Sequence, residues 1–259
     1  MKIDAIDAFS DNIIWAFEGP RGGVVVVDPG DAAPVLQYLL ERSAWLEGVL
    51  ITHHHHDHVG GLEGLQAEAP RAPDADALAR IPVYGPEDCV SAGVTHVVRA
   101  GDRVPVGTGG RSATTLAVPG HTQDHLAFFL DGPPAVLFSG DTLFAGGCGR
   151  LLEGTAEQMY DSLTRLDQLP AETLVYCAHE YTLSNLLFAA HAFPQSDAIQ
   201  ARLKSVTALR SAGGRSLPST LGVERDTNPF LLAPDLESFR ALRAAKDSFR
   251  PAAPPVNPL

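Results

Sequence analysis

The stretch that decides the fold is Ile51-Thr52-His53-His54-His55-His56-Asp57-His58-Val59-Gly60-Gly61. Five histidines and one carboxylate occupy the six consecutive positions 53–58, one residue after the apolar residues 49–51. Closely spaced neutral imidazoles and a carboxylate bind borderline divalent metals such as zinc. The plain alternative is an affinity tag or a solvated polyhistidine loop, but this run is internal and follows a strand-like segment. The run therefore predicts a metal site at the end of a strand.

Size and charge narrow the class of protein. The chain has 259 residues, 45% hydrophobic and 19% charged, which suits a globular protein of one large or two modest domains. No apolar run is long enough to span a bilayer, and residues 1–7 alternate instead of forming a secretory signal, so we expect no membrane partner. A net charge of -12 argues against nucleic acid as a partner. Three cysteines are too few for a disulfide framework and predict a reducing cytoplasm.

The first 180 residues read as short strands separated by turns. The β-branched run Val24–Val27 predicts a strand buried on both faces. Helical spacing predicts helices over 33–45, 60–67 and 155–169, the last capped by Thr155 and stopped by Pro170. Further strands are expected at 1–9, 13–17, 49–51, 81–84, 96–99, 114–118, 126–130, 135–138 and 174–177.

The pattern changes after about Tyr181. Amphipathic helices are predicted over 183–193, 197–211 and 235–249, with a Gly/Ser/Pro-rich loop at 213–220. The tail 251–259 is rich in proline and is expected to be irregular. We therefore predict an α/β domain over residues 1–180 and a helical domain over residues 181–259.

Three later segments repeat the arrangement of an apolar strand followed by one metal-competent side chain. They are Gly120-His121-Thr122, Gly140-Asp141-Thr142 and Ala178-His179-Glu180. Alone, a histidine after a strand is more often ordinary polar filler, and a Gly-Asp pair is usually a turn. The repetition in a chain that already carries a histidine cluster favours a shared metal centre.

Taken together, these segments resemble the metallo-β-lactamase superfamily. Its motif H-x-H-x-D-H matches His53 to His58, and the separate His, Asp and His follow in order at His121, Asp141 and His179. In this register His54 and His56 are the x positions. The resemblance implies an α/β fold, an αββα sandwich of two mixed sheets flanked by helices, with the metals at one edge between the sheets.

The resemblance narrows to glyoxalase II, the hydroxyacylglutathione hydrolases. The segments that carry it are 141–150, 152–155, 178–185 and the pattern R-x-x-K-D-x-F at 243–249. With these, it covers essentially the whole chain, including the α-helical C-terminal domain. It implies hydrolysis of the thioester S-D-lactoylglutathione, and of related S-2-hydroxyacylglutathiones, to glutathione and the 2-hydroxy acid, in methylglyoxal detoxification.

The same resemblance implies roles for the metal ligands. His53, His55 and His121 would hold one divalent ion and Asp57, His58 and His179 a second. Asp141 would bridge the two together with a hydroxide, so Asp57 and Asp141 are the expected catalytic carboxylates. Zinc is expected at both positions, and iron or manganese also suits these nitrogen and oxygen ligands.

Glutathione carries two carboxylates, for which the resemblance offers Arg150, Arg243 and Lys246, with Tyr181 adding a hydroxyl. Arg243 and Lys246 are spaced i, i+3 and so share one helix face. On periodicity alone, such a pair is more often a solvated basic face. The resemblance favours substrate binding, and we expect a monomer.

Two other functions are weighed against this one. A persulfide dioxygenase-like enzyme would use one iron held by His53, His121 and Asp141, but such proteins generally lack a helical region like 182–249. A non-catalytic metal-binding module would close its site with four protein ligands, whereas this set leaves room for water.

Overall fold

The computed structural model describes residues 1–74, 76 and 80–250, so the tail 251–259 lies outside the described residues. Within them, twelve strands form two six-stranded sheets. The first sheet has the order β1 (Ile3–Ala8), β2 (Asn12–Glu18), β3 (Val24–Val27), β4 (Leu46–Leu50), β5 (Val83–Gly85) and β6 (His96–Val97). The second has the order β14 (Ser219–Thr220), β13 (Leu174–Cys177), β10 (Val136–Gly140), β9 (Leu126–Leu130), β8 (Ser112–Ala117) and β7 (Arg103–Pro105). Each sheet mixes parallel and antiparallel pairs.

Both sheets are buried on both faces, which explains their nearly continuous apolar strands. Val25 and Val27 pack between the sheets, whereas Val24 and Val26 pack against the outer helices. In β10, Phe138 likewise points into the layer between the sheets. This alternation confirms the predicted strand that is buried on both sides.

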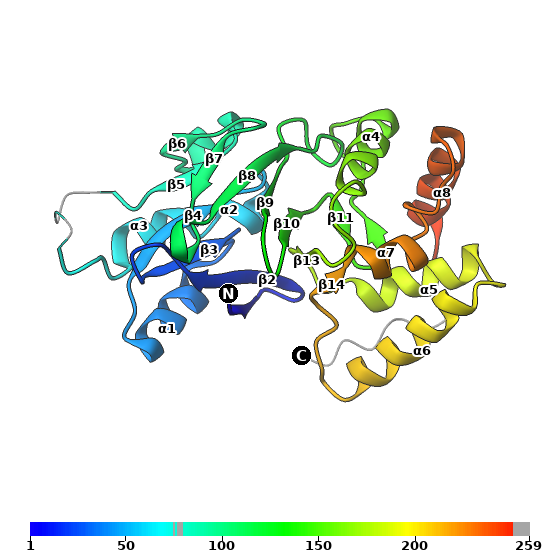
Figure 1. Ribbon diagram of the computed structural model, residues 1–259, viewed down its shortest axis with the longest axis horizontal. Coiled ribbons are helices and arrows are strands. Elements are labelled where there is room, and N and C mark those ends of the chain that lie inside the picture. The colour runs from blue at the N-terminus through cyan, green and yellow to red at the C-terminus, as the bar shows by residue number, and fades with distance from the viewer. Residues whose placement is uncertain (75, 77–79, 251–259) are drawn as a thin grey trace.

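Helices cover the outer face of each sheet (Figure 1). Helices α1 (Ala32–Arg42) and α3 (Leu62–Glu68) pack on the first sheet through residues such as Leu39 and Leu65. Helices α4 (Ala156–Leu166), α5 (Thr182–Ala192) and α8 (Leu236–Ser248) cover the second sheet with Met159, Phe188 and Phe239. The layers are helix, sheet, sheet, helix, as predicted for an αββα sandwich.

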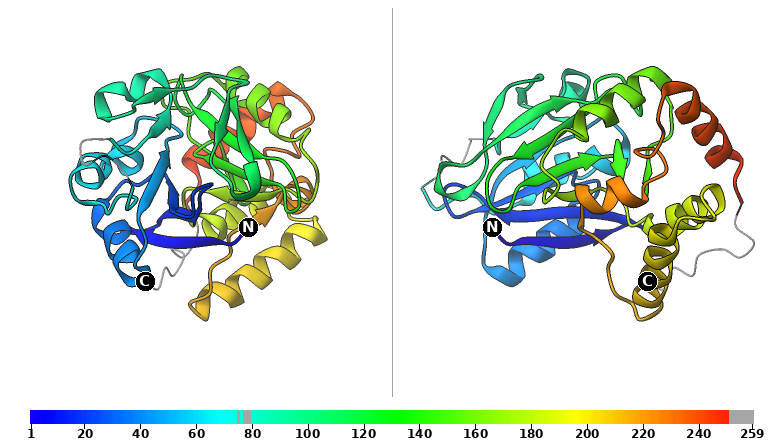
Figure 2. Two further views of the ribbon diagram at one scale, coloured as in Figure 1. Left: turned by 60° about the vertical axis from the view of Figure 1, so that its left-hand side comes forward. Right: turned by 45° about the vertical axis from the view of Figure 1, so that its right-hand side comes forward.

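The C-terminal helices gather beside the second sheet, in the green-to-red half of the molecule (Figures 1 and 2). Helix α6 (Asp197–Ser211) packs on α5, and α7 (Leu221–Thr227) precedes α8. The predicted loop 213–220 ends in β14, where Thr220 pairs with Leu174 of β13. This region therefore contributes an edge strand to the second sheet, and the division near residue 180 stays a prediction.

Several short elements differ from the predictions. Helix α1 ends three residues early because Ser43 adopts a left-handed conformation (φ 50°). The second half of the histidine run is itself a helix, α2 (His56–Val59). Also unpredicted are β7, β11 (Leu143–Phe144), β12 (Gly147–Cys148), β14, α7 and two 3-10 turns, η1 (Glu87–Ala92) and η2 (Thr108–Gly110). Elements this short carry too little periodicity to be recognised. Among the described helices, none is long and apolar enough to cross a bilayer.

Candidate metal centre and substrate cavity

The predicted ligands lie after the ends of strands from both sheets. Strand β4 leads into the histidine run, and β8, β10 and β13 of the facing sheet lead to His121, Asp141 and His179. Gly140 allows the two sheets to approach here. It has φ 49°, and a Cβ at this position would lie 2.5 Å from Thr52 Oγ1.

Three imidazoles form the first cluster. His55 Nδ1 lies 3.0 Å from His53 Nε2 and 3.0 Å from His121 Nε2. The three nitrogens converge on one point and can hold one metal ion.

Asp57, His58 and His179 form the second cluster. Asp57 Oδ2 lies 3.5 Å from His58 Nε2 and 3.4 Å from His179 Nε2. Asp141 stands between the clusters, because its Oδ2 is 3.4 Å from His121 Nε2 and its Oδ1 is 3.3 Å from His179 Nε2. The structure thus brings together all seven predicted ligands.

The outward-facing nitrogens of three of these histidines meet acceptors. His58 Nδ1 lies 3.1 Å from Asp28 Oδ2, and His179 Nδ1 lies 2.8 Å from Asp11 Oδ1. His121 Nδ1 lies 2.8 Å from the carbonyl oxygen of Arg150. An acceptor at Nδ1 keeps the proton there, so the lone pair of Nε2 points into the centre.

Sequence reasoning missed the residues that orient the ligands. Asp11, Asn12 and Asp28 read only as turn residues, yet Asn12 Nδ2 donates to Asp57 Oδ2 (2.9 Å). His125 was not singled out, and its Nε2 accepts from the backbone N–H of Asp141 (3.1 Å). The available signal was position, since Asp11, like the ligands, borders a strand end and Asp28 directly follows β3.

The charges of the centre suit metal ions. Burial, and then the neighbouring His58, lower the pKa of His53, which keeps that imidazole neutral. Burial opposes a charged His58, but Asp141 and Asp28 outweigh it and raise the pKa of His58, so this half of the centre calls for a cation. Within the described residues, His58 Nε2 and Asp141 Oδ1 face the centre and are buried without a hydrogen-bond partner. His58 Nδ1 also has no hydrogen-bond partner there, and its contact with Asp28 is an ion pair. Buried unpaired groups are costly, and two divalent ions would satisfy the two atoms that face the centre.

The two x positions of the histidine run point away from the clusters. His54 Nδ1 lies 2.6 Å from Asp88 Oδ2, and its Nε2 lies 3.0 Å from Glu153 Oε1. His54 therefore links the histidine run to η1 and to the loop after β12. His56 is exposed at the start of α2.

A cavity of about 540 Å³ opens beside the metal centre. His121 and Asp141 line it, together with the four predicted substrate-binding residues, Arg150, Tyr181, Arg243 and Lys246. The remaining lining residues are Phe144, Cys148, Ser184, Asn185, Phe249 and Arg250. The cavity thus joins the metal centre to a cationic wall.

The four predicted substrate-binding residues differ in how accessible their polar groups are to a substrate. The Tyr181 ring stacks on His179, with centroids 4.7 Å apart. Lys246 Nζ donates to the Ser184 carbonyl (3.1 Å), and Arg150 is exposed.

Arg243 is only 4% exposed, and its guanidinium donates to the carbonyls of Cys148 and Gly149 and to Asp247. Arg243 therefore adds positive charge to the wall while its Nη atoms are bound within the protein.

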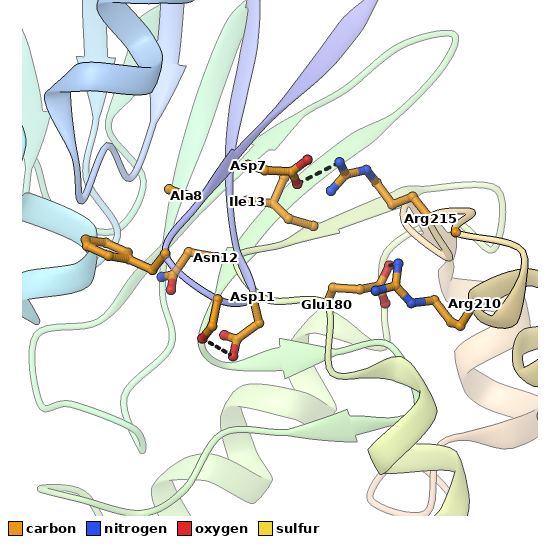
Figure 3. A pocket seen from close by; sticks show the side chains of 11 residues that line it. Asp7, Ala8, Asp11, Asn12, Ile13, Glu180, Arg210 and Arg215 are labelled. Carbon is orange, nitrogen blue, oxygen red and sulfur yellow. Dashed lines mark hydrogen bonds and ion pairs between the residues drawn. The ribbon is translucent and has the colours of Figure 1, made fainter. Parts of the chain in front are cut away.

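A second cavity, of about 200 Å³, lies beside the turn between β1 and β2 (Figure 3). Its cations are matched by acids, because Arg215 lies 2.7 Å from Asp7 and Arg210 lies 3.6 Å from Glu180. We assign it no ligand.

Comparison with family models divides the chain into two matched parts. Residues 12–179 match the model of the metallo-beta-lactamase superfamily, and residues 180–249 match that of the hydroxyacylglutathione hydrolase C-terminus. The hydroxyacylglutathione hydrolase of Pseudomonas putida (strain GB-1) is 47% identical over 270 residues, which cover 96% of this chain and 100% of that protein.

Two solved structures are also similar. ETHE1 from Myxococcus xanthus has a TM-score of 0.69 and 27% identity, over 97% of this chain and 93% of that one. TTHA1623, solved in a di-iron-bound form, has a TM-score of 0.59 and 25% identity, over 89% of this chain and 100% of that one.

Proposed function

Because the chain belongs to the hydroxyacylglutathione hydrolases of the metallo-β-lactamase superfamily, we propose that it hydrolyses S-D-lactoylglutathione and related S-2-hydroxyacylglutathiones in methylglyoxal detoxification. The products are glutathione and the 2-hydroxy acid. One observation carries this proposal: a single cavity is lined both by the metal-centre residues His121 and Asp141 and by the cations Arg150, Arg243 and Lys246.

In the proposed centre, His53, His55 and His121 would hold one ion and Asp57, His58 and His179 would hold the other. The position of Asp141 supports its role as the shared ligand, since its two oxygens face different clusters. Zinc is the proposed metal at both positions, because it suits imidazole and carboxylate donors. The di-iron form of TTHA1623 makes iron the first alternative to measure, followed by manganese.

The chemistry that two divalent ions would supply here, once bound, is a hydroxide nucleophile at neutral pH and polarisation of the thioester carbonyl. The chain itself fixes the ligands, because Asp28, Asp11 and the Arg150 carbonyl orient three of the histidines. The leaving group is a thiolate, which is stable without a proton, so the site needs no strong general acid. Asp57 and Asp141 contribute negative charge that would favour two cations close together.

The cationic wall is proposed to hold the two glutathione carboxylates. Burial, and then the charge of Arg243, lower the pKa of Lys246 to about 8, so Lys246 is still a cation at neutral pH. Arg150 and Lys246 offer direct contacts, and the buried Arg243 strengthens the field. Burial, reinforced by Asp11 and Asp141, raises the pKa of Tyr181, so its hydroxyl keeps its proton and can donate to the substrate.

The alternative functions fit less well. A mononuclear iron enzyme using His53, His121 and Asp141 leaves the convergent group Asp57, His58 and His179 without a purpose. A non-catalytic module leaves the cavity beside the centre unexplained. We also propose a monomer that works in the cytoplasm, where its three free cysteines, Cys89, Cys148 and Cys177, would stay reduced.

The decisive experiment combines metal analysis with a panel of thioesters. Protein containing close to two metal ions per chain should hydrolyse S-D-lactoylglutathione much faster than a lactoyl thioester of a short thiol without carboxylates. Asp141→Ala should lose both activity and metal, whereas Asp161→Ala, at an exposed position of α4, should lose neither. Fully metallated wild-type protein without thioesterase activity would contradict the proposal.

A further inference from the structure

The segment from Asp141 to Arg150 joins two parts of the metal centre. It begins at the carboxylate that faces both clusters and ends at the carbonyl that lies 2.8 Å from His121 Nδ1. Between them, β11 and β12 form a hairpin that is a sheet of its own, with two residues in each strand. So short a hairpin has few hydrogen bonds of its own, so its position depends on what surrounds it.

Side chains from beyond residue 180 bind a main-chain group of every residue from Phe144 to Gly149. We call the four side chains, Asn185, Glu224, Asn228 and Arg243, the hairpin brace. Asn185 donates to the Ala145 carbonyl (3.1 Å), and Glu224 accepts from the Gly146 N–H (2.7 Å). Asn228 donates to the Phe144 and Gly147 carbonyls (3.1 and 2.9 Å). Arg243 donates to the Cys148 and Gly149 carbonyls (3.1 and 3.3 Å).

The hairpin brace is buried, and its one carboxylate is fully paired. Glu224 and Asn228 are 0% exposed, and Asn185 and Arg243 are 4% exposed. Glu224 Oε1 accepts from Arg202 and Ser219, both at 2.5 Å, while its Oε2 accepts from Gly146 and Asn228. In a buried network of this kind, losing one partner leaves others unpaired and is costly. The brace therefore holds the hairpin in one position.

The hairpin has no room to shift without moving metal ligands. A Cβ at Gly149 would lie 2.0 Å from the Asp141 carbonyl oxygen and 3.3 Å from His121 Cβ. A Cβ at Gly147 would lie 2.6 Å from the Asn185 side chain. Backbone packed this closely transmits a displacement of the hairpin to Asp141 and His121.

We propose that Glu224 and Asn228 are positioning residues of the metal centre. Through the hairpin they hold Asp141 at one end and the Arg150 carbonyl, which orients His121, at the other. Neither residue lines the cavity, so they act through the hairpin and make no contact with substrate. The helical C-terminal region therefore sets metal affinity as well as lining the substrate cavity. Only the kinetic test of this inference rests on the proposed function.

The test is Glu224→Gln in the full-length holoprotein. The glutamine side chain has one oxygen and one NH₂ group in place of two oxygens. Its NH₂ must face either Arg202 and Ser219 or the Gly146 N–H and Asn228. In both orientations a hydrogen-bond donor then faces another donor. Measured by competition with a chelator, affinity for zinc should fall about tenfold or more, as when other residues that orient metal ligands are changed. With zinc resupplied, kcat should fall more than KM rises.

The matched control is Arg225→Met, at the next residue of α7. Arg225 binds Asp167 (2.7 Å) and the Leu169 carbonyl (2.7 Å), so it anchors the same helix but not the hairpin. It should lower Tm and leave zinc affinity unchanged. Equal loss of zinc affinity in both variants, or wild-type affinity in Glu224→Gln, would overturn the proposal.

Two further measurements keep the inference testable if Glu224→Gln does not fold. Asn228→Ala removes two bonds to the hairpin and one to Glu224 but leaves the buried pair of Glu224 and Arg202 in place, and it should weaken zinc binding in the same way. In the wild-type protein, the Gly146 amide should exchange with solvent as slowly as the amides of β10, and fast exchange would refute the brace. If the wild type binds zinc but hydrolyses no glutathione thioester, the proposed function fails while the zinc comparisons still decide this inference.

Discussion

At the scale of single residues, the predicted metal ligands depend on neighbours that sequence motifs do not contain. Asp28 shows this most clearly. It adopts φ 52°, accepts from the Thr52 N–H and hydroxyl (both 2.8 Å), and faces His58 Nδ1. An acidic residue in this position fixes the backbone at Thr52, where the histidine run begins, and favours the His58 tautomer that carries its proton on Nδ1.

We therefore expect Asp28→Asn to weaken metal binding about 10- to 100-fold. If the asparagine carbonyl accepts from the Thr52 N–H, its NH₂ faces His58 Nδ1. His58 would then carry its proton on Nε2, where the metal needs the lone pair. Chelator competition measures the change, and Asp167→Asn, at a partly exposed ion pair far along the chain, should have no effect. Unchanged affinity would mean that Asp28 serves only the fold.

The pH profile of kcat/KM should have an alkaline limb, a fall in activity at high pH, that comes from Lys246. Its pKa is lowered to about 8, so it is charged below that pH and neutral above it. We expect kcat/KM for a glutathione thioester to fall as pH rises through about 8. Lys246→Met should lower kcat/KM about tenfold at pH 7, the value of one charged hydrogen bond, and remove this limb. Lys204→Met, at an exposed lysine of α6, should change neither the rate nor the pH profile.

At the scale of elements, the sequence predicted what long periodic segments specify. The Thr155 cap of α4 is present, with a reciprocal bond in which the Thr155 N–H donates to Gln158 Oε1, and α6 has its predicted bounds, 197–211. The strands that lead to the predicted metal ligands were also predicted. The β11–β12 hairpin was not, because two-residue strands have no period and their position comes from the brace, whose residues lie far away in the sequence. Asp11 and Asp28 were missed for a similar reason, since turn chemistry alone explains an aspartate there.

The cap of α4 can be tested apart from the metal centre. Thr155→Ala removes the acceptor for the Gln158 N–H and should cost about 1 kcal/mol of unfolding free energy. Thr164→Ala makes the same substitution at an exposed site inside the same helix, where alanine's helix propensity should leave stability equal or slightly higher. Urea unfolding measures both, and the metal content of both variants should equal that of the wild type. Equal effects on stability would show that the cap contributes nothing.

At the scale of the whole molecule, overall and local charge oppose each other. The chain carries a net charge of -12, which repels an anionic thioester. Arg150, Arg243, Lys246 and Arg250 nevertheless line one cavity. Distance decides which effect dominates, because the screening length is about 10 Å at 0.1 M salt and about 3 Å at 1 M. At 0.1 M the distant acids are already largely screened, while cations that line the cavity would lie within the screening length of a substrate bound there.

We therefore expect kcat/KM for S-D-lactoylglutathione to fall about three- to tenfold between 0.1 and 1 M sodium chloride, as two ion pairs of up to about 1 kcal/mol each are weakened. The change should appear in KM, since the carboxylate contacts are remote from the reacting carbonyl and kcat does not depend on them. A thioester without carboxylates should show a flat profile, and so should the double variant Arg150→Met/Lys246→Met with the natural substrate. If kcat/KM instead rose over this range, the net charge of the molecule would govern the encounter, and the cationic wall would not be the binding surface for glutathione.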